Sequence, residues 1–309
     1  MKNLLTQINE SATIKPYIKH IIGLILFLLI PNLVTTPLRI FVEAVIYNKK
    51  EAPAFISAGF IIYSFIVEIV FYIGYYVLGR KLPIKNTVLR GFTYIMLILF
   101  SSYLPNILAM AGGDGQIISD SLSIGIIVVD IISYTIKGLV LGLVNNNDYI
   151  DKPEDISPIT GFRFTTACLV NGVLFAALNY LFDMGIGAID RSWKLSSLLG
   201  VSSQRETAFY IIFILFMFVA GFIIALWYRY NLPAGTLISG TVLFGLKLSV
   251  ITWLPNVLIM AFFGTPFVKT FTYGVVYIIM FVICVLIYRK IFLTEDVLCN
   301  NMTQMNSLH

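Results

Sequence analysis

Charged residues are scarce in this sequence, and their scarcity excludes an ordinary soluble fold. Only 12% of the 309 residues are charged, about half of the roughly 25% that is usual in soluble domains. Because 58% of the residues are hydrophobic, too few polar side chains remain to cover a soluble surface. The net charge of +5 arises from basic residues in short segments between apolar runs, which argues against a nucleic-acid-binding surface.

Histidine, cysteine and the common catalytic motifs are also missing or rare. The two histidines are His20 and His309, and the three cysteines show neither a CxxC pair nor metal-ligand spacing. The chain contains no GxxxxGKS/T, HExxH or GxSxG motif, which argues against nucleotide hydrolysis of that type, a zinc protease and a serine hydrolase. We therefore expect no cofactor and no metal, and an enzyme is the least favoured class.

Apolar runs long enough to cross a membrane recur along the whole chain. A helix of about 20 apolar residues matches the hydrocarbon thickness of a bilayer, and backbone groups in lipid must be satisfied within the helix. The sequence therefore predicts an all-α, polytopic integral membrane protein with about eight transmembrane helices. The expected spans are Ile21–Pro37, Ala54–Leu78, Gly91–Ala111, Leu122–Val144, Phe164–Phe182, Ala208–Tyr228, Leu237–Phe262 and Thr270–Tyr288.

The position of the first span and the basic residues predict the orientation. A secretory signal would place its apolar core sooner than this chain does, after the polar residues 1–20, so we expect a retained span. Twelve of the 21 lysines and arginines fall in segments on the N-terminal side of the membrane, and seven fall on the other side. Cytoplasmic segments carry the excess of basic residues, so the sequence predicts a plasma-membrane protein with both termini in the cytoplasm.

One phrase with an internal proline occurs twice, 150 positions apart. The chain reads SYLPNILAMA from Ser102 and TWLPNVLIMA from Thr252, with six of ten positions identical. A Leu-Pro pair at 82–83 and another at 232–233 keep the same offset. Since each half then holds an even number of spans, the pattern predicts two parallel four-helix repeats. The expected halves are residues 1–144 and 162–309, joined by a cytoplasmic linker at 145–161.

The repeated phrase predicts two bent helices. Proline removes one amide donor and clashes with the preceding turn, so Pro105 and Pro255 should each kink a span. Asn106 and Asn256 follow them, and hydroxyl and amide side chains there can satisfy the loosened backbone or bond across helices. Two interpretations stay open: structural kinks held by local hydrogen bonds, or pseudo-symmetric bends that line a central pathway.

Four ionisable side chains fall within the expected spans: Glu68, Asp130, Lys137 and Lys247. A charge at the centre of a transmembrane helix costs about 2.5–3.5 kcal/mol on insertion scales, so each should face the bundle or water. Glu68 shares a helix face with Ser57, Ser64, Tyr72 and Tyr75. This polar stripe lines a crevice or serves an ion pair. Lys247 needs a carboxylate, with Glu68 as the expected partner and Asp130 as the second choice, whereas Lys137 should extend toward the headgroups.

Two functional classes follow from these features. The repeat, the kinks and the buried charges favour a small-solute transporter or permease, with Glu68, Asp130, Lys247, Asn106 and Asn256 as candidates for the pathway or its ion pair. The alternative is a non-transporting membrane protein, such as a subunit of a complex or a protective or regulatory protein. The expected partners are the lipid bilayer and an unidentified small solute, without nucleic acid; the sequence leaves room for a protein partner or a homo-oligomer.

Overall fold

All the regular secondary structure that is described in this protein is helical. The computed structural model describes residues 15–42, 44, 58–104, 124–145, 161–231, 238–262 and 265–292, and every regular element within them is a helix. The principal helices are α2 Lys15–Phe41, α3 Ala58–Val77, α4 Thr87–Ile98, the π-helical η4 Leu99–Tyr103, α7 Ile124–Val144, α8 Gly161–Ile189, α10 Glu206–Asn231, the π-helical η6 Ile238–Val242, α11 Leu243–Thr252, α12 Leu254–Phe262 and α13 Phe267–Phe292. Shorter helices are η3 Gly79–Lys81, η5 Arg191–Trp193 and α9 Leu195–Leu198.

Six of the described helices are long and apolar enough to cross a membrane, which makes this a multi-pass membrane protein. They are Ile18–Phe41, Ile61–Lys81, Ile127–Val144, Gly161–Ile189, Glu206–Asn231 and Phe267–Phe292. Two shorter apolar helices, Thr87–Tyr103 and Gly240–Thr252, lie at the positions of the third and seventh expected spans. Large apolar side chains such as Leu33, which is 71% exposed, cover the outside of the bundle, as expected for contact with lipid. A total of eight spans stays a prediction.

Two expected boundaries were wrong. The first span was expected to end at Pro37, but α2 continues through Pro31 and Pro37 to Phe41. Between these two prolines, Thr35 donates its hydroxyl to the carbonyl of Pro31, four residues earlier, at 2.8 Å. The fifth span is also longer than expected. Its two asparagines do not interrupt α8, because Asn179 bonds within its own helix and Asn171 bonds the neighbouring α10.

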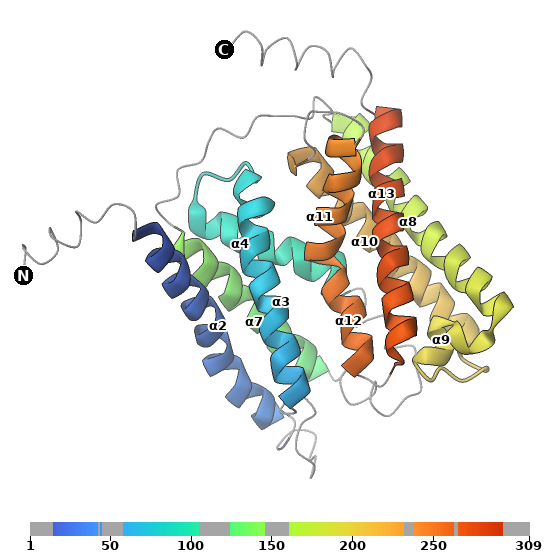
Figure 1. Cartoon of the computed structure of the whole chain (residues 1–309), viewed down its shortest axis with the longest axis horizontal. Coiled ribbons are helices and arrows are strands. Elements are labelled where there is room, and N and C mark those ends of the chain that lie inside the picture. Colours follow the sequence, from blue (N-terminus) through green and yellow to red (C-terminus); the bar gives the residue numbers. More distant parts are fainter. Residues whose placement is uncertain are drawn as a thin grey trace, which may run out of the picture.

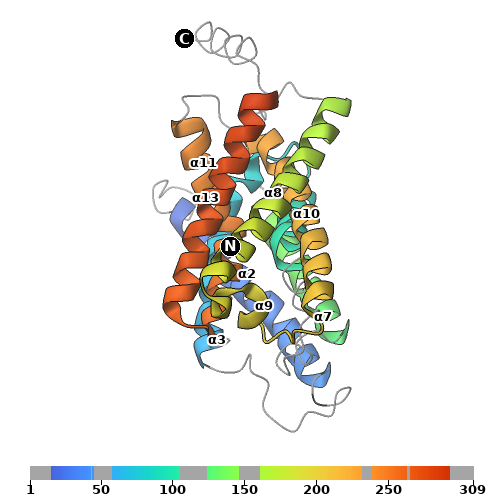
Figure 2. The same ribbon diagram turned by 90° about the vertical axis from the view of Figure 1, so that its right-hand side faces the viewer.

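The helices form two groups (Figure 1). In the first group α7 packs along α2 and α4, and α3 lies beside α2 and α4. In the second group α8 packs along α10 and α13, and α13 also packs along α11 and α12. The short helix α9 lies at the end of the second group opposite to the end of α13 that leads to the C-terminus (Figure 2). Most contacts between helices therefore lie within a group.

Glycine allows the tightest helix contact in the first group. A Cβ atom added at Gly142 of α7 would lie 2.4 Å from the Cα of Val88 in α4 and 2.5 Å from the Thr87 carbonyl oxygen. Both atoms belong to the backbone and cannot move aside independently of the helix. Small residues that let backbones approach are a principal source of helix association in lipid, where no hydrophobic force acts between helices. This seam fixes α7, which carries two of the buried charged residues.

Candidate functional site

Three of the four charges that the sequence places inside the membrane, Glu68, Asp130 and Lys137, lie buried between α2, α3 and α7. Glu68 of α3 is 2% exposed, and its Oε1 lies 2.7 Å from Nζ of Lys137 in α7. Asn32 of α2 points its Nδ2 at both carboxylate oxygens, at 3.3 and 3.2 Å. The same Nδ2 donates to the Leu28 carbonyl at 2.7 Å, which holds the amide in place. The carboxylate thus has both a cationic partner and an amide donor, and this arrangement lets a membrane interior tolerate its charge.

A second carboxylate, that of Asp130, lies on α7 seven residues before Lys137. At a rise of 1.5 Å per residue, the two residues are about 10 Å apart along the helix. Oδ1 of Asp130 lies 3.4 Å from Nη1 of Arg39 at the end of α2, and the Tyr103 hydroxyl donates to its Oδ2. The Tyr134 ring lies between the two carboxylates. Its centroid is 5.5 Å from Nζ of Lys137 and 5.0 Å from the centroid of the Tyr103 ring. Two ion pairs and a tyrosine ring therefore line one side of α7.

The expected pairing of Lys247 with Glu68 was wrong. Lys247 lies on the exposed face of α11, and Lys137 occupies the position beside Glu68. Lys137 does not extend toward the headgroups as expected, because it is 8% exposed within the bundle. Asp130, the second expected partner for Lys247, is paired with Arg39 instead. The small and polar residues Gly245, Ser249 and Thr252 of α11 lie on its buried face, away from Lys247, and were the available signal of which face points inward.

The side chains of the two candidate asparagines of the repeated phrase are not among those described. Asn106 and Pro105 lie outside the described residues. Asn256 is part of α12, but its side chain is not among those described. Their expected role in the pathway therefore stays a prediction.

The hydroxyls that precede the prolines are described, and they bond to their own helices. Oγ of Ser102 donates to the Ile98 carbonyl at 2.8 Å, and Oγ1 of Thr252 donates to the Leu248 carbonyl at 2.7 Å. Each hydroxyl bonds the carbonyl four residues earlier, so the two copies of the phrase make the same side-chain hydrogen bond to their own helix. Such back-bonding often bends a helix.

Both copies begin where a helix departs from α geometry. The π-helical η4 ends at Tyr103, and α11 gives way to α12 at Trp253, which is the equivalent position of the second copy. Each irregular segment lies against the other group of helices, since η4 contacts α10 while α11 and α12 contact α3. The Tyr63 hydroxyl of α3 donates to the Pro255 carbonyl, which fixes one of these contacts.

A third buried carboxylate escaped the sequence analysis, which placed it in an outer loop. Asp183 of α8 is 1% exposed, and it accepts hydrogen bonds from the hydroxyls of Tyr210 in α10 and Tyr273 in α13. The Leu195 amide of α9 donates to it as well, at 2.7 Å. Tyr273 also lies 2.7 Å from the Trp193 carbonyl of η5. The tyrosines near the N-terminal ends of α10 and α13 were the available signal for this cluster, which joins the short helices to the bundle.

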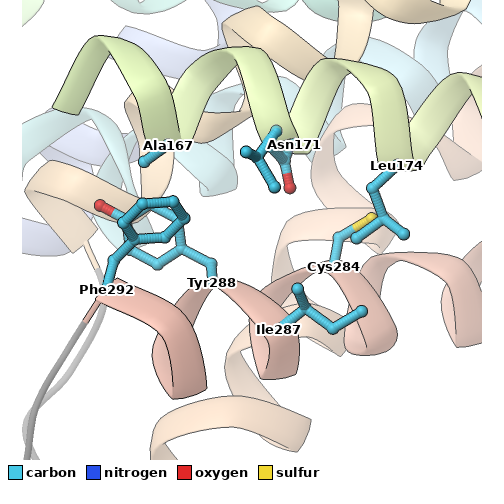
Figure 3. A pocket seen from close by; sticks show the side chains of 8 residues that line it. Ala167, Asn171, Leu174, Cys284, Ile287, Tyr288 and Phe292 are labelled. Atoms are coloured by element: carbon cyan, nitrogen blue, oxygen red, sulfur yellow. The ribbon is translucent and has the colours of Figure 1, made fainter. Parts of the chain in front are cut away.

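A narrow cleft lies between α8 and α13 (Figure 3). Asn171 and Leu174 line it from α8, and Cys284 and Tyr288 line it from α13. It holds about 160 Å³ of empty space, including its open side, but it is too constricted for a water molecule. The cleft is therefore no solute site in this conformation.

The described residues bring together no group of three or more His, Cys, Asp and Glu side chains that could hold a metal ion. The chain matches no protein-family model, and no curated protein or solved structure is significantly similar to it. Fold and site together define a multi-pass helical membrane protein with paired charges in its interior.

Proposed function

We propose that the protein is a transporter of a small solute, with a pathway between two pseudo-symmetric halves. The halves would be residues 1–144 and 162–309, joined by the segment 145–161, in the plasma membrane with both termini in the cytoplasm. The observation that carries this proposal is the pair of irregular helices at the contact between the two groups. Discontinuous helices at a repeat interface are where secondary transporters form their binding sites.

The contacts between the groups support the symmetry. The third apolar segment, through η4, contacts the sixth, α10, whereas the seventh, α11 and α12, contacts the second, α3. Exchanging the two halves turns the first of these contacts into the second. The matched back-bonds of Ser102 and Thr252 support the same correspondence, because their acceptors are also 150 positions apart. Parallel repeats of this kind are related by an axis along the membrane normal.

A non-transporting role is the second candidate, and burial favours it. Glu68, Asp130 and Asp183 are at most 7% exposed, and each has hydrogen-bond or ionic partners within the bundle. Such groups suffice to hold helices in register in a subunit or a regulatory membrane protein. The two candidates differ in whether the contact between the groups must move.

Locking that contact tests the proposal. The variant combines Tyr63→Cys on α3 with Pro255→Cys on α12, in a Cys299→Ser background. A bis-methanethiosulfonate cross-links the two thiols, and a reductant breaks the cross-link. We expect metabolite profiles of cells with and without the protein to differ. Cross-linking should abolish that difference, and reduction should restore it.

Each single cysteine variant is the matched control, and the reagent should leave unchanged the metabolite profile that this variant has before treatment. The proposal fails if no metabolite depends on the protein. It fails equally if the cross-linked pair behaves like the single variants.

A further inference from the structure

A third polar cluster lies at the end of the first group where α2 begins. Nδ1 of His20 lies 3.0 Å from the Tyr76 hydroxyl, and this hydroxyl lies 2.6 Å from Oδ1 of Asn145, just after α7. The Tyr72 hydroxyl lies 3.1 Å from that of Tyr76 and donates to the His20 carbonyl at 3.1 Å. Like the pair of Glu68 and Lys137, this cluster is built by α2, α3 and the end of α7, whereas the pair of Arg39 and Asp130 joins α2 and α7.

The three clusters lie at successive depths along α2 and α7. On α2, His20 and Asn32 are 12 residues apart and Arg39 follows after seven more, which are rises of about 18 Å and 10 Å. Together they cover about 28 Å, close to the roughly 30 Å thickness of the hydrocarbon core. We call the set the polar ladder: His20, Tyr72, Tyr76 and Asn145 at one end, Asn32, Glu68 and Lys137 at the centre, and Arg39, Tyr103, Asp130 and Tyr134 at the other end.

We propose that the polar ladder carries protons across the membrane, with Glu68 as the proton-accepting group at its centre. This inference rests on the proposed function in one respect, namely that the proton gradient drives transport of the solute. Intramembrane chains of carboxylate, histidine and other polar groups are the usual means by which membrane proteins move protons.

Proton binding at Glu68 exchanges one contact for another. Hydronium at one surface breaks an O–H bond and becomes water, and the proton forms an O–H bond at the Glu68 carboxylate. The ionic contact with Lys137 breaks, while Lys137 keeps its own proton and charge. Asn32, which lies against both oxygens, can still hold the neutral carboxyl through its carbonyl oxygen. Release of the proton to water on the other side restores the carboxylate and its pairing with Lys137. The ion pair thus has two arrangements that differ by one bound proton.

The surroundings of Glu68 fit a proton better than a metal cation. An ammonium group already occupies the place beside the carboxylate, and the Asn32 Nδ2 that faces it is a donor. Sodium and other hard cations need several oxygen ligands, whereas the described residues offer no group of three acidic or His and Cys ligands. The other titratable or charged groups around this centre are Asp130 and Tyr134 of α7, His20 and Arg39 of α2, Tyr103 of η4, and Tyr63 and Tyr72 of α3. Lys247 of α11 lies on the exposed side, and α12 carries no titratable residue.

One step of the ladder is closed. Phe27 of α2 is fully buried, and its ring centroid lies 5.7 Å from that of Tyr72, between the His20 cluster and the depth of Glu68. These two packed rings stand between the His20 cluster and Glu68, so a proton passes this depth only after a rearrangement. A closed step is what coupling requires, because an uninterrupted chain would dissipate the gradient.

Proton flux into proteoliposomes tests the inference. The purified protein is reconstituted in phosphatidylethanolamine and phosphatidylglycerol liposomes that contain the pH dye pyranine. A potassium gradient with valinomycin makes the interior negative, and a filtered metabolite extract is added outside. We expect acidification by the wild type and complete loss in Glu68→Gln. Glu68→Asp, which keeps a titratable carboxylate, should retain flux.

A second variant separates function from folding. Lys137→Met combined with Glu68→Gln removes both charges and strands neither, so it should fold and still carry no protons. The inference is overturned if liposomes with this double variant acidify as fast as those with the wild type. It is also overturned if wild-type liposomes acidify no faster than protein-free liposomes, or if a sodium gradient supports uptake without any change in the dye signal. Proton flux without any protein-dependent metabolite would overturn the proposed solute transport alone. Metabolite differences without proton flux would overturn this inference alone.

Discussion

Replacing Lys137 with methionine should strongly destabilise the protein, because the Glu68 carboxylate would be left buried at 2% exposure without its cation. Breaking a buried pair from one side typically costs about 3–5 kcal/mol. Asn32 still faces both carboxylate oxygens after the change. We therefore expect the lower end, about 3 kcal/mol, which shifts the folding equilibrium by more than about 100-fold. The free energy of unfolding, measured by sodium dodecyl sulfate titration in mixed micelles, reports this loss.

Two variants calibrate that measurement. Lys247→Met makes the same substitution on the exposed face of α11 and should change the free energy of unfolding by no more than about 0.5 kcal/mol. Adding Glu68→Gln to Lys137→Met should recover most of the loss, since no charge is then stranded. If Lys137→Met proved as stable as Lys247→Met, the pair would contribute nothing and the reasoning about the buried carboxylate would be refuted.

Three further predictions concern other parts of the molecule. Gly142→Ala should lower the free energy of unfolding by about 1–3 kcal/mol through overpacking against the α4 backbone. Gly185→Ala, with no atom within 4 Å of the new Cβ, should leave it unchanged, and equal thermal stability of the two variants would count against the glycine seam. Asp183→Asn should speed tryptic cleavage between α8 and α10, because asparagine keeps only one acceptor oxygen and cannot accept from both Leu195 and Tyr210; an unchanged cleavage rate would contradict this. In a Cys299→Ser background, an impermeant thiol reagent added outside cells should label Ser203→Cys but not Lys85→Cys, and the reverse result would invert the predicted orientation.

Composition and run length predicted the helical membrane class, and described helix occurs at all eight expected positions. The polar stripe on the second span also predicted correctly that Glu68 faces inward. Such features depend on one helix at a time, and the spacing of residues along the chain is enough to find them.

The partners of the buried charges depend on several helices, and the sequence missed them. Lys137 and Lys247 both lie within apolar runs, but only packing decides that the first meets Glu68. The predicted first span ends at Pro37, which places Arg39 in an outer segment, whereas α2 continues to Phe41. Asp183 was missed for a similar reason, because its helix was predicted too short. Pairings of this kind require the rotation and the length of each helix, and neither is readable from hydropathy.

The containment of the polar ladder within the first group has a consequence for biosynthesis. The ion pairs of Glu68 with Lys137 and of Asp130 with Arg39 lie wholly before residue 146 and need no residue of the second group. In a chain inserted from its N-terminus, Arg39 and Glu68 enter the bilayer first, and α7 then supplies the partners of both. We infer that both pairs can form before the second group is translated.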